Sequence, residues 1–66
     1  MFPRIKETRT KRKMTQAEIA EKLGIWQTAY SHYETGARDI SLEMASKIAD
    51  ILGVSLDYLA GRSDEP

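Results

Sequence analysis

The sequence contains no cysteine, one histidine and one tryptophan. Without cysteine it can form neither a disulfide nor a thiolate metal site. One histidine among scattered carboxylates supplies almost no material for a zinc site or a nucleophile triad, so we expect no enzyme, no metal and no cofactor. No apolar run approaches the roughly 18 residues of a membrane span, and the opening MFPRIKETR lacks a signal-peptide core. We therefore expect a cytoplasmic protein without a membrane partner or a small-molecule substrate.

Proline is confined to Pro3 and Pro66, and no stretch alternates apolar and polar residues beyond a few positions. A chain without internal proline or strand alternation favours an all-α fold. Its 66 residues, of which 41% are hydrophobic, allow one small domain. Four glycines punctuate the chain: Gly24, Gly36, Gly53 and Gly61.

Capping residues set the expected helix boundaries. Thr15 with Glu18 three residues later has the pattern of a capping box, and Ser41 and Ser55 are further N-cap candidates. Pro3 suits a first helical position. We expect helices over residues 3–12, 16–23, 27–35, 42–52 and 56–60, and a polar, frayed tail over 62–66. The fourth helix is expected to bury one face, formed by Leu42, Ala45, Ile48, Ala49 and Leu52.

Basic residues are concentrated at the start of the chain. Residues 1–13 carry six Lys or Arg against one Glu, whereas residues 14–66 carry four against nine acidic residues. The net charge of zero therefore conceals a basic end of +5 and an acidic remainder of −5. These charges either form two solvated faces or direct the basic end towards a polyanion, and composition alone does not decide between the two.

Only Gly24-Ile25-Trp26 joins the second and third expected helices, and so short a turn crosses two helices steeply. The surrounding pattern is Thr15-Gln16, Ile19-Ala20, Leu23-Gly24-Ile25 and Tyr33-Glu34 before Gly36, flanked by Ile5-Lys6-Glu7 with Arg9 and by Ser41-Leu42-Glu43 through Leu52-Gly53-Val54-Ser55-Leu56-Asp57. This pattern resembles the lambda-repressor-like (Cro/CI-type) helix-turn-helix DNA-binding family over about residues 3–60. The resemblance implies a compact bundle of five short helices, with the second and third forming the helix-turn-helix, in a DNA-binding domain of residues 1–61.

Four residues depart from the family pattern. Trp26 stands where a small capping hydroxyl is usual, so we expect the third helix to lack a side-chain cap. Tyr30 is larger than the usual Ile or Val, and Thr8 stands where Leu is common. Lys13 stands where Gly or Asn often relaxes a left-handed turn.

The resemblance places the third helix in the major groove of DNA, with its first residues towards the base edges. The expected base readers are the exposed polar residues of this helix: Gln27, Thr28, Ser31 and His32. Gln27 is the best of them because its amide can pair bidentately with adenine. His32 could donate to guanine, or be a solvated surface residue.

The DNA backbone is expected to meet Gln16, Trp26 and Arg38. Gln16 opens the second helix, whose free N–H groups suit a phosphate. Trp26 either packs against the turn, which we favour, or presses on the sugar-phosphate edge. Arg38 either grips a phosphate or pairs with Asp39 or Glu43.

The resemblance also pairs Arg9 with Glu34, as a structural link between the first and third helices. Tyr30 and Tyr33 are expected on the core side of the third helix. In the fifth helix region we expect Leu56 and Leu59 to fill the core.

We therefore expect a sequence-specific, double-stranded DNA-binding transcriptional regulator, a repressor that binds a palindromic operator as a homodimer. Val54 and Tyr58 are the expected dimer surface. An antitoxin or a restriction controller would share the same fold. A protein-interaction module that has lost DNA binding is a different class, which the neutral net charge and Trp26 allow.

Overall fold

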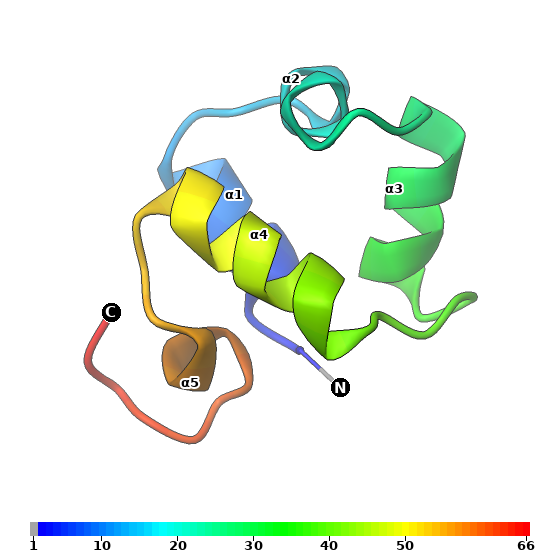
Figure 1. Ribbon diagram of the computed structural model, residues 1–66. Helices are drawn as coiled ribbons and strands as arrows, with labels where there is room; N and C mark the ends of the chain where they lie inside the picture. Colours follow the sequence, from blue (N-terminus) through cyan, green and yellow to red (C-terminus); the bar gives the residue numbers. More distant parts are fainter. Residues whose placement is uncertain (1) are drawn as a thin grey trace.

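In the computed structural model, which describes residues 2–66, all regular structure is helical, so the predicted all-α fold of five short helices is confirmed. The helices are α1 (Ile5–Lys11), α2 (Gln16–Leu23), α3 (Gln27–Thr35), α4 (Leu42–Leu52) and α5 (Leu56–Leu59) (Figure 1). Within residues 2–66 no helix is long and apolar enough to cross a membrane.

Local capping fixes where three of the helices begin. The capping box at α2 is confirmed: the Glu18 N–H donates to Thr15 Oγ1 at 3.1 Å, and the Thr15 N–H donates to Glu18 Oε1 at 3.0 Å. The hydroxyls of Ser41 and Ser55 accept a backbone N–H at the starts of α4 and α5. Gly24 ends α2 with a φ of 72°, a left-handed conformation that glycine adopts without a Cβ clash.

The first helix begins two residues later than predicted. Pro3 lies in a turn, and Arg4 precedes α1 as its N-cap. The Arg4 N–H instead donates to the carbonyl of Leu59 at 3.3 Å, so the start of the chain is tied to α5. After α1, Lys13 has a φ of 58°, the left-handed turn that its position in the sequence indicated.

Helix α4 crosses the middle of the molecule, with α1 behind it, α2 and α3 on one side and α5 on the other (Figure 1). It contacts α1, α2 and α5. The buried apolar residues are Ile5, Ile19, Ala20, Tyr30, Ala45, Ile48, Ala49, Leu52 and Leu59. Leu42 was expected on this face, and that prediction is wrong: as the first residue of α4 its side chain is 67% exposed, whereas Ala45, three residues on, is fully buried.

Residues 63–65 make contacts that the sequence did not predict, and the tail curves round α5 (Figure 1). Arg4 Nη1 donates to the carbonyl of Ser63 at 2.9 Å, and Arg4 Nη2 lies 2.8 Å from Asp64 Oδ1. The same guanidinium lies 4.7 Å from the centre of the Tyr58 ring, a cation–π contact. Arg4 therefore links the start of the chain to the tail beside α5.

Candidate nucleic-acid interface

A tight turn holds α2 and α3 at a fixed angle. The Gly24 N–H donates to the Glu21 carbonyl, and the Ile25 N–H donates to the Ala20 carbonyl, both at 3.1 Å. Ala20 is buried, and its small side chain leaves room for α3 to come close. The packing of α2 on α3 therefore sets the direction in which the first turn of α3 faces.

The first turn of α3 is open to solvent. Trp26 precedes the helix and makes no side-chain hydrogen bond to it, so the predicted lack of a cap is confirmed. The Trp26 side chain is 84% exposed. The favoured expectation that it packs against the turn is wrong, since a side chain packed there would not be so exposed to solvent.

Five polar residues from the two helices line one shallow hollow of about 270 Å³: Gln16, Gln27, Thr28, Ser31 and His32. Gln27, Thr28 and His32 are exposed, whereas Ser31, which was expected to be exposed, is half-buried. All five side chains are neutral or weakly basic donors and acceptors. The hollow therefore brings together all four expected base readers and one expected backbone contact.

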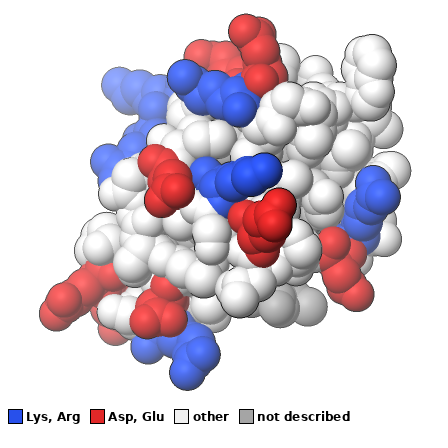
Figure 2. All heavy atoms as spheres, viewed as in Figure 1, with Lys and Arg blue, Asp and Glu red and all other residues white. Residues whose placement is uncertain are grey.

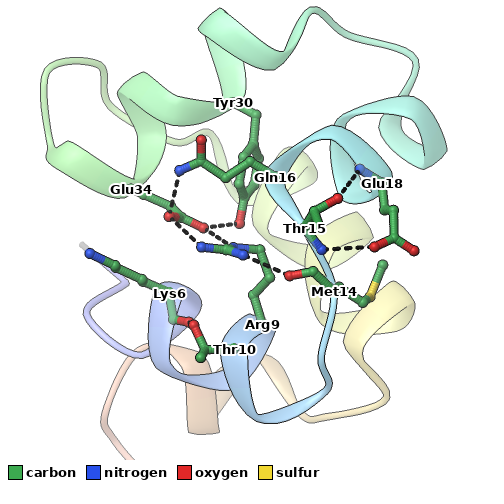
Figure 3. Close-up of polar contacts among 9 residues, drawn as sticks. All are labelled: Lys6, Arg9, Thr10, Met14, Thr15, Gln16, Glu18, Tyr30 and Glu34. Atoms are coloured by element: carbon green, nitrogen blue, oxygen red, sulfur yellow. Dashed lines mark hydrogen bonds and ion pairs between the residues drawn. The ribbon is translucent and has the colours of Figure 1, made fainter.

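Beneath this hollow, the carboxylate of Glu34 accepts hydrogen bonds from three side chains (Figure 3). Arg9 donates through Nε to Oε2 at 2.6 Å and through Nη2 to Oε1 at 3.2 Å. The Tyr30 hydroxyl donates to Oε2 at 2.6 Å, and Gln16 Nε2 donates to Oε1 at 3.0 Å. The structure thus brings Arg9 and Glu34 together, with side chains that are 12% and 2% exposed.

Two of these partners were not expected from the sequence. Tyr30 stands four residues before Glu34, a spacing at which helix side chains meet, so this contact had a local signal. Gln16 is 18 residues before Glu34 and on a different helix, so only the crossing angle of α2 and α3 brings the two together. Arg9 also donates to the Met14 carbonyl at 2.7 Å, which ties α1 to the loop before α2.

The cluster shifts the pKa of each of its titratable members. Burial alone would raise the pKa of Glu34, but the hydrogen bonds from Arg9, Tyr30 and Gln16 outweigh it and hold that pKa below its ordinary value. The hydrogen bond to Glu34 raises the pKa of Arg9. Burial and the hydrogen bond to Glu34 raise the pKa of Tyr30. At neutral pH the carboxylate is therefore ionised and the phenol neutral.

Charged side chains of both signs are interspersed on the face that Figure 2 shows, with neutral side chains at the upper right, where α3 begins. Arg38 follows α3 and is exposed; its N–H donates to the His32 carbonyl at 3.2 Å. Within residues 2–66 its guanidinium forms no salt bridge, whereas Glu43, one of the partners considered for it, lies 3.8 Å from Lys47. The positive charge of Arg38 is therefore unpaired within residues 2–66, just past the C-terminal end of α3.

At α5 the structure reverses part of the expected packing. Leu59 is buried, but Leu56, expected in the core, is half-exposed and lies outside the core cluster. Val54 packs against the core in its place. The half-exposed side of α5 therefore consists of Leu56 and Tyr58, with Val54 at its edge.

Comparison with known proteins identifies the family that has this geometry. The model of the Helix-turn-helix family matches residues 5–59, which include all five helices. The chain belongs to the Cro/CI-type helix-turn-helix family of DNA-binding regulators. Helices α2 and α3 form the helix-turn-helix of this family.

Similar proteins agree with this membership. The chain is 45% identical over 62 residues to the uncharacterized HTH-type transcriptional regulator YqaE of Bacillus subtilis (strain 168), covering 92% of this chain and 53% of YqaE. It is 46% identical over 48 residues to the cryptic phage CTXphi transcriptional repressor RstR of Vibrio cholerae serotype O1, covering 73% of this chain and 43% of RstR. An HTH-type transcriptional regulator of Archaeoglobus fulgidus is 37% identical over 65 residues, covering 98% of this chain and 93% of that protein. The chain thus spans about half the length of YqaE and nearly all of the archaeal relative.

Proposed function

We propose that this domain binds a specific sequence of double-stranded DNA and regulates transcription, as a repressor acting on a palindromic operator. The observation that carries the proposal is the hollow between α2 and α3. The side chains of Gln27, Thr28 and His32, which line it, form no hydrogen bond to other residues within the described chain. Donors and acceptors that the fold does not use are free to bind a ligand.

In the proposed complex α3 lies in the major groove. Gln27 has the longest uncommitted amide on the first turn, and it reads adenine by accepting from N6 and donating to N7. Thr28, Ser31 and His32 follow it along the groove. Gln16 and Arg38 bind phosphates on either side, and Trp26 presses its exposed ring on the sugar-phosphate edge.

The first test identifies the preferred DNA sequence and then removes the side chain of Gln27, which is proposed to read a base. Selection from a random duplex library gives the preferred sequence, and fluorescence anisotropy gives the affinity of wild type and Gln27→Ala for that sequence and for random DNA. Gln27→Ala should lose about 1–3 kcal/mol on the preferred site and relax the preference at one base pair. Ser46→Ala, on the exposed side of α4, is the control and should change neither value.

An equal loss on both kinds of DNA would assign Gln27 to phosphate binding instead of base reading. The affinity should also fall steeply as salt is added, because Lys and Arg contacts to phosphate release counterions. A wild-type protein with no salt-dependent DNA affinity would favour the protein-interaction module over the regulator.

The operator-binding unit is proposed to be a homodimer. One recognition helix reads only a few base pairs, and a two-fold pair places two such helices about 34 Å apart, one turn of DNA. Val54 and Tyr58 are the proposed contact, and Leu56 extends it, because Leu56 and Tyr58 are half-exposed on α5 and Val54, which precedes α5 and packs partly against the core, is also half-exposed. So small a surface suits a weak dimer that DNA stabilises.

Sedimentation with a palindromic duplex tests the dimer. Two proteins should bind each duplex, and Tyr58→Asp should abolish cooperative binding. Arg4→Met is the control, since it removes the cation–π contact to Tyr58, together with the Arg4 contacts to Ser63 and Asp64, but keeps the tyrosine. One protein per duplex at saturation would refute the dimer, and cooperative binding by Tyr58→Asp would refute this surface.

Repression is proposed by analogy with the relative RstR, whose name states that it is a transcriptional repressor. A cytoplasmic location is proposed with it, because that is where a regulator of bacterial or archaeal type meets DNA.

A further inference from the structure

We propose that Glu34 is a positioning residue, which holds the amide of Gln16 ready to bind a phosphate of the DNA backbone. The inference rests on the proposed DNA-binding function. It concerns a carboxylate that is itself out of reach of DNA, because its side chain is 2% exposed.

The geometry links the two residues directly. Gln16 is the first residue of α2 and lines the hollow, and Glu34 lies in the last turn of α3 beneath it. Gln16 Nε2 donates to Glu34 Oε1 at 3.0 Å, so the amide nitrogen points inward from the half-buried Gln16 side chain. Figure 3 shows the amide of Gln16 turned towards the Glu34 carboxylate.

This hydrogen bond decides which atoms Gln16 can offer. A side-chain amide has two N–H donors on nitrogen and an acceptor oxygen, whereas a phosphate oxygen is an acceptor only. With one N–H held by Glu34, the amide cannot turn over, and its second N–H remains available to a phosphate. A free glutamine would sample both orientations and lose more rotamer freedom when it bound DNA.

A carboxylate directly behind a phosphate site would repel the phosphate if its charge were not balanced. Arg9 balances it with two hydrogen bonds, at 2.6 and 3.2 Å. Tyr30 occupies Oε2, so Gln16 shares only Oε1, and only with the longer bond from Arg9. Glu34 therefore serves as an acceptor for Gln16 without presenting a net negative charge to DNA.

Two matched variants test the inference without leaving a lone buried charge. Both carry Arg9→Met, and position 34 is changed by Glu34→Gln in one and by Glu34→Leu in the other. The two have equal charge, but only the Glu34→Gln member keeps an oxygen acceptor for Gln16. Neutral side chains of similar size commonly replace a buried ion pair without loss of stability.

The affinity of both variants is measured on the selected duplex at one salt concentration. The Glu34→Leu member should bind about three- to tenfold more weakly than the Glu34→Gln member, which is the affinity lost when one side chain, that of Gln16, has to be ordered on binding. When Gln16→Ala is added to both, the difference should vanish. A difference that persists with Gln16→Ala, or equal affinities at the start, would overturn the inference and leave Glu34 as a purely structural residue.

The side-chain amide of Gln16 provides a second readout that needs no DNA and no variant at position 34. In ¹⁵N NMR spectra of the wild-type protein, assigned with Gln16→Ala, its NH₂ group should show restricted motion and one slowly exchanging proton. A freely rotating amide would overturn the inference whatever the DNA result. If the amide is held but the wild-type protein binds no duplex, the proposed function fails, and with it the role of Gln16 on phosphate.

Discussion

Removing Arg9 alone should destabilise the fold far more than removing Arg9 and Glu34 together. In Arg9→Ala the Glu34 carboxylate stays buried and keeps only the two neutral donors, Tyr30 and Gln16. A buried charge that has lost its partner typically costs about 3–5 kcal/mol. The whole free energy of unfolding of a 66-residue domain is on the order of 3–10 kcal/mol. Arg9→Ala should therefore be close to unfolded at physiological temperature.

Glu34→Ala should be milder, because the 12% exposed guanidinium of Arg9 can reach water and still donates to the Met14 carbonyl. The double variant should recover part of the loss, since no unpaired charge is left inside. Urea denaturation of wild type, both single variants and the double variant closes a double-mutant cycle. We expect a coupling energy of about 2 kcal/mol or more, well above the 0.2–1 kcal/mol of an exposed pair. Coupling within error of zero would refute the argument that burial makes this pair strong.

Three further predictions concern stability. Thr8→Val should raise the free energy of unfolding by about 1 kcal/mol in urea, because Thr8 Oγ1 is buried and has no hydrogen-bond partner in residues 2–66; a loss would mean that the hydroxyl has a partner. Lys13→Gly should raise it by about 0.5–1 kcal/mol, because glycine accepts a φ of 58° without strain, whereas Lys13→Ala should not. The free energy of unfolding should fall as pH drops below about 4.5, because Glu34 takes up a proton in the unfolded state before it does so in the native state, and it should fall again as pH rises above about 10.0, because Tyr30 ionises first in the unfolded state. If removal of Glu34 left the loss of stability in acid unchanged, the acid part of this prediction would be contradicted.

The fold prediction rested on capping patterns whose residues lie within one turn of a helix. Thr15 and Glu18 are three residues apart, and their capping box forms wherever the chain turns into a helix. Ser41 and Ser55 act in the same local way. Pro3 misled because a proline that fits a first helical position fits a turn equally well, and the contact to α5 decided between them.

Features that depend on how helices cross could not be read from spacing. Leu42 has the helical period of the α4 core face, but as the first residue of α4 it is exposed, whereas Ala45, three residues on, is buried. Leu56, which was expected in the core cluster, lies outside it, and Val54 packs partly against the core, because the burial of so short an element depends on its neighbours and not on its own pattern. The hydrogen bond from Gln16 to Glu34 likewise exists only because α2 and α3 meet at one angle.

In the candidate interface too, the sequence indicated individual residues, whereas the packing of the helices determines how they are brought together. The resemblance supplied Gln16, Gln27 and Arg38 as positions, and the structure adds the shared hollow and the buried carboxylate beneath it. The exposure of Trp26 was indicated only by its place at the N-cap position of the third helix, and its size and apolar ring favoured packing instead.

Trp26 is the one tryptophan of the chain, and its ring lies in water in the folded protein. Its fluorescence should therefore hardly change when the domain unfolds, since the indole has much the same surroundings in both states. The same emission should shift to shorter wavelength and become less accessible to iodide quenching when a ligand covers the first turn of α3. The protein thus carries a built-in optical probe that is nearly blind to folding and sensitive to binding.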